Sequence, residues 1–287
     1  MGSGTIAASH LLPHLHRVAQ QAQPHDVTYY ALVALAGLIV GTLTGLTGVG
    51  GGSLVTPLLV LLLHISPTIA VGTDLLYSVP TKLLGATVHH RQGTVNWRLV
   101  RYLVTGGVPG AIAGLILLAY LQTHLSVTAV NAAIKHSLGI TLVCVAAAII
   151  VKPLLSHIMK STPSATVDWT SGAVARVVTL GLLVGFIVSL TSIGSGALTM
   201  PMLFFLVPQI GLRRLVGSDV AFSAILIPVA AIGFLHMGNV NLALAGSLLI
   251  GSLPGIVIGS KLVMRIPDTW VRPALAVCVG VAGLKLI

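Results

Sequence analysis

Two clusters of glycine and hydroxyl residues lie in strongly apolar parts of the chain, and their composition suits anion binding. The first cluster is TGVGGGSLVTP, from Thr47 to Pro57, and the second is TSIGSGALTMP, from Thr191 to Pro201. Glycine is a poor helix former, so each cluster predicts a break in a helix. The helix that begins after a break points free backbone N–H groups and the positive end of its dipole at the break, where an anion could bind.

The two breaks together predict one anion site in the middle of a membrane. Half-helices beginning at Ser53 and Ala197 would direct their N-termini at the same ligand, and glycine would let that ligand approach the backbone closely. The residues that we expect to bind the substrate are Gly48, Gly50, Gly51, Gly52, Ser53, Thr56, Lys82, Ser192, Gly194, Ser195, Gly196 and Thr199. Close packing of helices is the alternative role for small residues, and we prefer it for the regularly spaced Gly37, Gly41, Gly45, Gly106, Gly110 and Gly114.

Three charged residues fall near or within apolar runs, where they need a partner or a function. An unpaired ammonium at the centre of a membrane costs roughly 2.5–3.5 kcal/mol on insertion scales. Lys82 is therefore expected either to add positive charge to the anion site or to pair with Asp74, two helical turns earlier. Asp74 and Asp219 are candidates for proton coupling, because ionisable groups within membranes often mark proton pathways. The alternative for both carboxylates is a cap at a helix N-terminus.

The composition places these residues in a membrane protein. Of the 287 residues, 55% are hydrophobic and 7% are charged, and the mean hydropathy is +1.03, whereas a soluble domain has roughly 25% charged residues. Most of the long apolar runs approach the roughly 20 residues that a helix needs to cross a bilayer. These runs are 29–47, 69–88, 99–121, 135–151, 174–190, 215–235, 242–262 and 270–287. The sequence predicts an all-α polytopic membrane protein.

The second half of the sequence repeats the first. GLIVGTLTGLTGVGGGSLVTPLL from Gly37 corresponds to GLLVGFIVSLTSIGSGALTMPML from Gly181, and Gly-Thr-Asp ending at Asp74 corresponds to Gly-Ser-Asp ending at Asp219. Each half holds a Gly-broken helical hairpin plus three transmembrane helices, which is an odd number of crossings. The two repeats are therefore expected to have inverted topologies, an arrangement that is typical of secondary transporters when it is combined with broken helices.

The basic residues predict how the chain is oriented in the membrane. We divide the chain into a polar N-terminal segment at 1–28, repeat 1 at 29–152, a cytoplasmic linker at 153–172 and repeat 2 at 173–287. With Arg91, Arg98 and Arg101 in the cytoplasm, most of the 15 Lys and Arg residues fall on that same side, as the positive-inside rule requires. Both termini are then on the non-cytoplasmic side of the plasma (inner) membrane. The formal charge of +10 reflects orientation and contact with anionic lipid, and no nucleic acid is expected as a partner.

The motifs TGVGGGSLVTPLL, AVGTDLLYSVPTKLLG and HHRQGTVNW are similar to those of the TauE/SafE family of sulfite exporters. The resemblance covers nearly all of the chain after residue 29, and it is specific to the family but not to one substrate. It implies a permease for a small sulfur oxyanion or sulfonate, such as sulfite, thiosulfate or an organosulfonate. Many members have an uncharged residue where this chain has Asp74 and Asp219, so the substrate and the ion coupling stay open.

Other functions fit the sequence less well. Cys144 and Cys278 lie in apolar runs without metal-ligand spacing, and His89 and His90 have no evident third ligand, so no metal and no other cofactor is expected. Neither break contains the GxSxG pattern of an intramembrane serine protease, and an enzyme is the weakest alternative. An anion channel built on the same half-helices is the stronger one. The oligomeric state stays open, and a homodimer is one option.

We therefore interpret the chain as a secondary transporter that works by alternating access at a mid-membrane site between the two broken helices. Export is the natural direction, because an inside-negative potential expels an anion with roughly 2.3 kcal/mol per charge per 100 mV.

Overall fold

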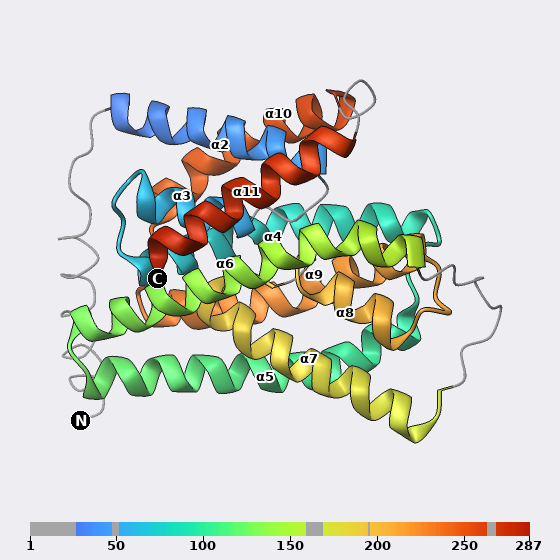
Figure 1. Cartoon of the computed structure of the whole chain (residues 1–287). Helices are drawn as coiled ribbons and strands as arrows, with labels where there is room; N and C mark the ends of the chain where they lie inside the picture. The colour runs from blue at the N-terminus through green and yellow to red at the C-terminus, as the bar shows by residue number, and fades with distance from the viewer. Residues whose placement is uncertain (1–26, 48–51, 159–168, 195, 263–267) are drawn as a thin grey trace, which may run out of the picture.

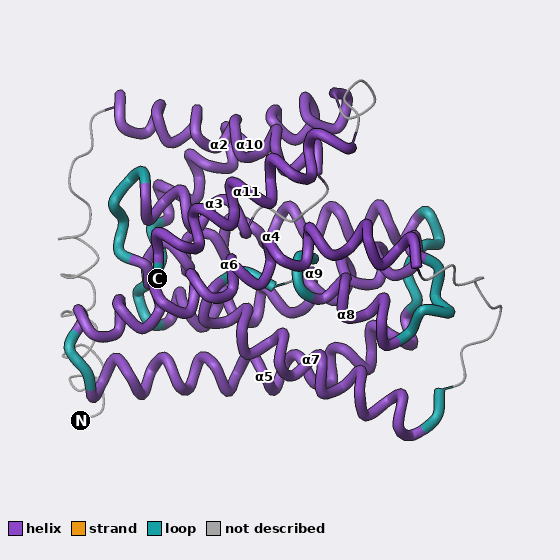
Figure 2. The backbone as a smooth tube through the Cα atoms, viewed as in Figure 1, coloured by secondary structure: helices purple, strands orange, loops and turns teal. Residues whose placement is uncertain are grey.

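The computed structural model describes residues 27–47, 52–158, 169–194, 196–262 and 268–287. Over these ranges all regular secondary structure is helical, which confirms the all-α prediction (Figure 1, Figure 2). The first half contains α2 (Val27–Thr47), α3 (Gly52–Leu61), α4 (Pro67–Arg91), α5 (Trp97–His124) and α6 (Val127–Ile158). The second half contains α7 (Ser171–Thr191), α8 (Thr199–Leu206), α9 (Leu212–His236), α10 (Leu242–Leu262) and α11 (Asp268–Leu286).

Five helices are long and apolar enough to cross a membrane over their described residues. They span Trp97–His124, Val127–Ile150, Ser171–Thr191, Arg213–His236 and Leu242–Gly259. Two further apolar stretches, Tyr29–Thr44 and Ala276–Leu286, are shorter. The apolar run predicted at 69–88 lies in α4, which has 25 residues but is less apolar because it contains Asp74, Lys82 and several hydroxyl residues.

Both predicted breaks separate a long helix from a short one. α2 ends at Thr47 and α3 begins at Gly52, so the first break, with the candidate ligands Gly48, Gly50 and Gly51, lies outside the described residues. α7 ends at Thr191 and α8 begins at Thr199, and in this second break Ser195 also lies outside the described residues.

The helices pack in pairs that join the two halves of the chain. α2 packs along α10 and α5 packs along α7, while α4 packs against α9 and α6 against α11 (Figure 1). Glycines make the first two contacts close: a Cβ added to Gly37 would lie 2.6 Å from the Leu248 carbonyl oxygen, and one added to Gly181 would overlap the Leu103 backbone. The packing role expected for the regularly spaced glycines is thus confirmed at Gly37 and, by similar overlaps, at Gly41, Gly106, Gly110 and Gly114.

Matching contacts join the halves at both ends of the central α4–α9 pair. At one end the Asn96 N–H donates a hydrogen bond to Ser218 Oγ at 2.8 Å, and at the other the Asn241 N–H donates to Thr73 Oγ1 at 3.1 Å. The first contact places the start of α9 beside the loop that follows α4, and the second places the start of α10 beside the start of α4. α4 and α9 therefore run in opposite directions.

Candidate substrate site

The first part of the candidate site is a buried carboxylate on α4. Asp74 is fully buried, and the hydroxyl of Thr56, in α3, donates a hydrogen bond of 2.5 Å to Asp74 Oδ2. Ser78, one turn further along α4, donates a much longer bond of 3.5 Å to Asp74 Oδ1. Ser78 was not among the residues predicted from the sequence, although its spacing of four residues from Asp74 on a helix would have indicated it.

Asp74 is not a helix cap, which excludes the alternative considered from the sequence. α4 begins at Pro67 after Ser66, so Asp74 lies two turns inside the helix. Asp219 has the same position in α9, which begins after Gly211. The start of α4 is held from another helix, because both the backbone N–H and the hydroxyl of Thr68 donate to Asn131 Oδ1 of α6. These bonds fix the first turn of α4 against α6, and Asp74 lies two turns further along α4, in the interior of the molecule.

The second part of the site is the connection between α7 and α8. Gly194 and Gly196 have φ angles of 143° and 90°, which favour glycine, and Ser192 ends α7 in the left-handed conformation with φ of 58°. The Gly194 carbonyl accepts hydrogen bonds from the Leu198 N–H and from both the N–H and the hydroxyl of Thr199. We had expected this helix to begin at Ala197. Because the turn precedes it, α8 begins at Thr199 instead.

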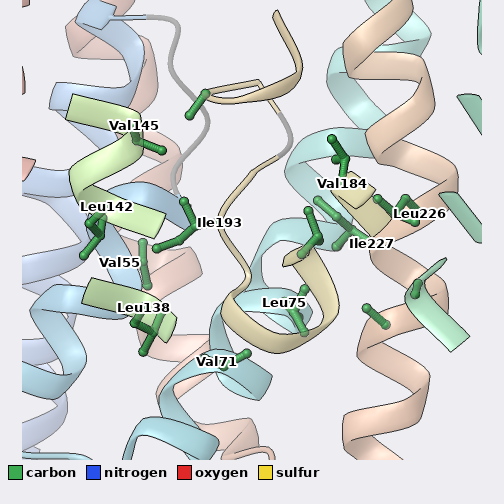
Figure 3. Packing of buried hydrophobic residues seen from close by; sticks show 14 of the residues in the cluster. Val55, Val71, Leu75, Leu138, Leu142, Val145, Val184, Ile193, Leu226 and Ile227 are labelled. Atoms are coloured by element: carbon green, nitrogen blue, oxygen red, sulfur yellow. The ribbon is translucent and has the colours of Figure 1, made fainter. Parts of the chain in front are cut away.

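The α7–α8 connection passes through the interior of the molecule. Ile193 is 1% exposed and belongs to the same hydrophobic cluster as Val55 of α3 and Leu142 of α6. Figure 3 shows the Ile193 side chain directed toward Val55. The apolar packing of Ile193 fixes the neighbouring Ser192 beside the helices of the first half.

Ser192 brings the second half of the chain to the carboxylate of the first. The Ser192 hydroxyl is near enough to the Asp74 carboxyl group to interact with it. The Ser192 side chain is buried, and its Oγ has no hydrogen-bond partner of acceptable geometry. The site thus contains a hydroxyl that can still donate a hydrogen bond, which is uncommon because buried polar groups are nearly always paired.

Lys82 connects this carboxylate to its counterpart. The Lys82 side chain is partly buried, and its ammonium group interacts electrostatically with both Asp219 and Asp74. Asp219 is 2% exposed in α9, where its backbone carbonyl accepts a hydrogen bond from Ser223. The sequence had offered Lys82 either to the anion site or to a pair with Asp74, and the structure adds Asp219 as a second acidic residue within its electrostatic range.

The remaining predicted residues lie close to these groups along the chain. Ser53 is buried in the first turn of α3, one turn before Thr56, and Gly52 is the first residue of that helix. The Thr199 hydroxyl is buried and donates to the Gly194 carbonyl, as described above. Within the described ranges no three His, Cys, Asp or Glu side chains are grouped so as to hold a metal ion. The arrangement offers hydroxyl groups, one ammonium and two carboxylates for binding a small polar ligand.

Comparison with known proteins decides the family. The family model described as "Sulfite exporter TauE/SafE" matches residues 33–286. The chain belongs to this family. It is 41% identical to the probable membrane transporter protein YjnA of Bacillus subtilis over 89% of this chain and 98% of that protein. It is 27% identical to the probable membrane transporter protein YdhB of the same organism, over 89% of this chain and 99% of YdhB.

Membership of the TauE/SafE family makes the chain a multi-pass membrane transporter and not an enzyme. The family resemblance inferred from the glycine motifs is confirmed. No solved structure matches the chain.

Proposed function

We propose that the chain is a secondary transporter that exports a small sulfur-containing anion, with sulfite, thiosulfate and organosulfonates as the substrate class. The observation that carries this proposal is the meeting of both halves at one buried polar site. Ser192 from the α7–α8 break, Thr56 from the short α3 and Asp74 from α4 converge there, with Lys82 nearby. The Ser192 hydroxyl and the Lys82 ammonium supply the donor and the positive charge that an oxyanion requires.

We further propose that the two halves are inverted repeats. The contacts between them are reciprocal: Gly37 packs on Leu248 and Gly181 on Leu103, and these four residues are two pairs of repeat counterparts. The hydrogen bond from Asn96 to Ser218 has its counterpart in the bond from Asn241 to Thr73. Reciprocal contacts of this kind are expected where two similar units meet about a two-fold axis, and the opposite directions of α4 and α9 support an axis that lies in the membrane plane.

The proposed orientation puts the loop after α4 in the cytoplasm. Arg91 and Arg98 flank that loop, Arg213 and Arg214 begin the adjacent α9, and the Arg98 guanidinium lies 5.6 Å from the centre of the Trp169 ring. The loops at the opposite end, 62–66, 125–126 and 237–241, contain no Lys or Arg. This distribution supports cytoplasmic basic loops, with both ends of the membrane domain on the other side.

Transport of labelled sulfite in proteoliposomes, with Lys82→Ala as the test variant, examines the proposed site. Loss of the Lys82 ammonium removes the positive charge that interacts with both buried acids, so we expect sulfite exchange to fall at least tenfold. The matched control is Lys135→Ala, a partly buried lysine on α6 outside the site, which should retain exchange. Full exchange by Lys82→Ala would show that Lys82 is structural, and no exchange of any sulfur anion by the folded unmodified chain would reject the substrate class.

A further inference from the structure

We propose that the anion binds together with one proton, which is shared between the bound oxyanion and Oδ1 of Asp74. By holding this proton, Asp74 would set the net charge of the site when the anion is bound. This inference rests on the proposed function, because it concerns the same site and the same class of anion.

The balance of charge in the site requires a proton. Lys82 interacts with both Asp74 and Asp219, so when all three are ionised they sum to one negative charge. An added monoanion would raise this to two negative charges beside two buried carboxylates, where uncompensated charge is costly. A proton taken up with the anion restores the charge that the site has when it is empty, so a monoanion that crosses with this proton is driven by concentration gradients and not by the membrane potential.

The hydrogen bonds around Asp74 identify the atom that would receive the proton. Oδ2 accepts the short bond from Thr56, whereas the bond that Oδ1 accepts from Ser78 is 3.5 Å long. A carboxylate oxygen has two lone pairs, so Oδ1 can form a further strong bond. Ser192 Oγ is buried near Asp74 and forms no hydrogen bond of acceptable geometry, so it can donate to another oxygen of the same anion. A sulfur oxyanion offers several oxygens, so it can bridge Ser192 and Asp74 when one proton lies between it and Oδ1.

The groups that surround Asp74 differ from those around Asp219, and they favour Asp74 as the residue that holds the proton. α4 itself contributes the amino group of Lys82 and Tyr77, whose phenol also interacts with Asp74. α9 contributes Asp219, which acts on the same Lys82. α3 and the α7–α8 connection contribute the hydroxyl groups of Thr56 and Ser192. The repeat counterpart of Thr56 is Met200, which cannot donate a hydrogen bond, so the environments of the two acids differ.

Binding of methanesulfonate to the purified full chain tests the proposal, because this anion has no proton of its own to lose between pH 5.5 and 8. We expect its Kd to increase by up to about tenfold per pH unit as the pH rises, and calorimetry in buffers of different ionisation enthalpy should show uptake of about one proton per anion. Asp74→Asn should remove both the pH dependence and the proton uptake. His136→Gln, on an exposed face of α6, is the control and should retain both.

Three results would overturn the proposal. These are methanesulfonate binding without proton uptake, unchanged proton uptake in Asp74→Asn, and loss of proton uptake in Asp219→Asn with retention in Asp74→Asn. The first result needs only the number of protons that the unmodified chain takes up per methanesulfonate bound, so it can be obtained even when a variant does not fold. Binding with no proton leaves the proposed function intact, whereas no binding and no transport of any sulfur anion would reject the proposed function itself.

Discussion

At the scale of single residues, Asp74 and its neighbours form the centre of the candidate site. The sequence indicated that Asp74 and Lys82 could share a helix face, because eight residues are about two turns. It could not indicate that Ser192 would lie beside Asp74, because the contact joins residues far apart in the chain and is fixed by the packing of Ile193. The capping alternative was wrong because it depended on where α4 begins, and Pro67 starts that helix two turns before Asp74.

The hydrogen bond from Thr56 to Asp74 should contribute to stability. Thr56→Val keeps the shape of the side chain but leaves a buried carboxylate oxygen without its short bond, so we expect a loss of about 1–3 kcal/mol in the free energy of unfolding. Thermal unfolding in detergent measures this loss. Thr87→Val is the matched control, because the exposed Thr87 hydroxyl bonds only to the Leu83 carbonyl of its own helix. Equal melting temperatures for the two variants would contradict this role of Thr56.

At the scale of helices, glycine contacts hold the two halves together. Gly41 and Gly185 are repeat counterparts, and a Cβ at either position would overlap the backbone of the facing helix, at Ser252 and Gly107 respectively. The sequence predicted this use for Gly41 from its regular spacing, but made no such prediction for Gly185. It placed the start of α8 two residues early, because the turn in which Leu198 and Thr199 bond to the Gly194 carbonyl depends on local backbone geometry that the sequence pattern does not specify.

Alanine substitutions test these helix contacts. Gly41→Ala and Gly185→Ala should each lower stability by about 1–3 kcal/mol, because the added methyl group forces two closely packed helices apart. Gly246→Ala in α10 is the control, since nothing lies within 4 Å of a Cβ at that position, and it should leave stability unchanged or slightly higher. The melting temperatures of the three variants provide the comparison. A loss in Gly246→Ala equal to that in Gly41→Ala would show that the effect does not come from helix contact.

At the scale of the whole molecule, the proposed inverted repeats place the two sets of loops on opposite sides of the membrane. Ser126, between α5 and α6, and Gln92, after α4, are both exposed. The α5–α6 and α4–α5 connections lie at opposite ends of α5 (Figure 1). In a chain whose exposed Cys144 and Cys278 are replaced by serine, a membrane-impermeant maleimide added outside the cell should label Ser126→Cys and not Gln92→Cys. Labelling of Gln92→Cys alone would reverse the orientation, and labelling of both would exclude the topology.

The proposed two-fold relation between the halves also bears on the proposed mechanism. The reciprocal hydrogen bonds at Ser218 and at Thr73 lie one residue before the two buried acids, Asp219 and Asp74. If one half moved against the other, a change in the hydrogen bond at Ser218 or Thr73 would also shift the carboxylate that follows it in the chain, Asp219 or Asp74. This coupling is what an alternating-access transporter needs between its gates and its central site.

The most direct test of the central claim is to measure sulfite exchange and membrane conductance in proteoliposomes that contain the unmodified chain. A transporter with one central site should exchange labelled sulfite for unlabelled sulfite, and the exchange rate should saturate as the sulfite concentration rises. We predict saturable exchange with no conductance above that of protein-free liposomes. Conductance far above the rate of exchange would show a channel, and the absence of both from folded protein would contradict the assignment of a sulfur anion to this site.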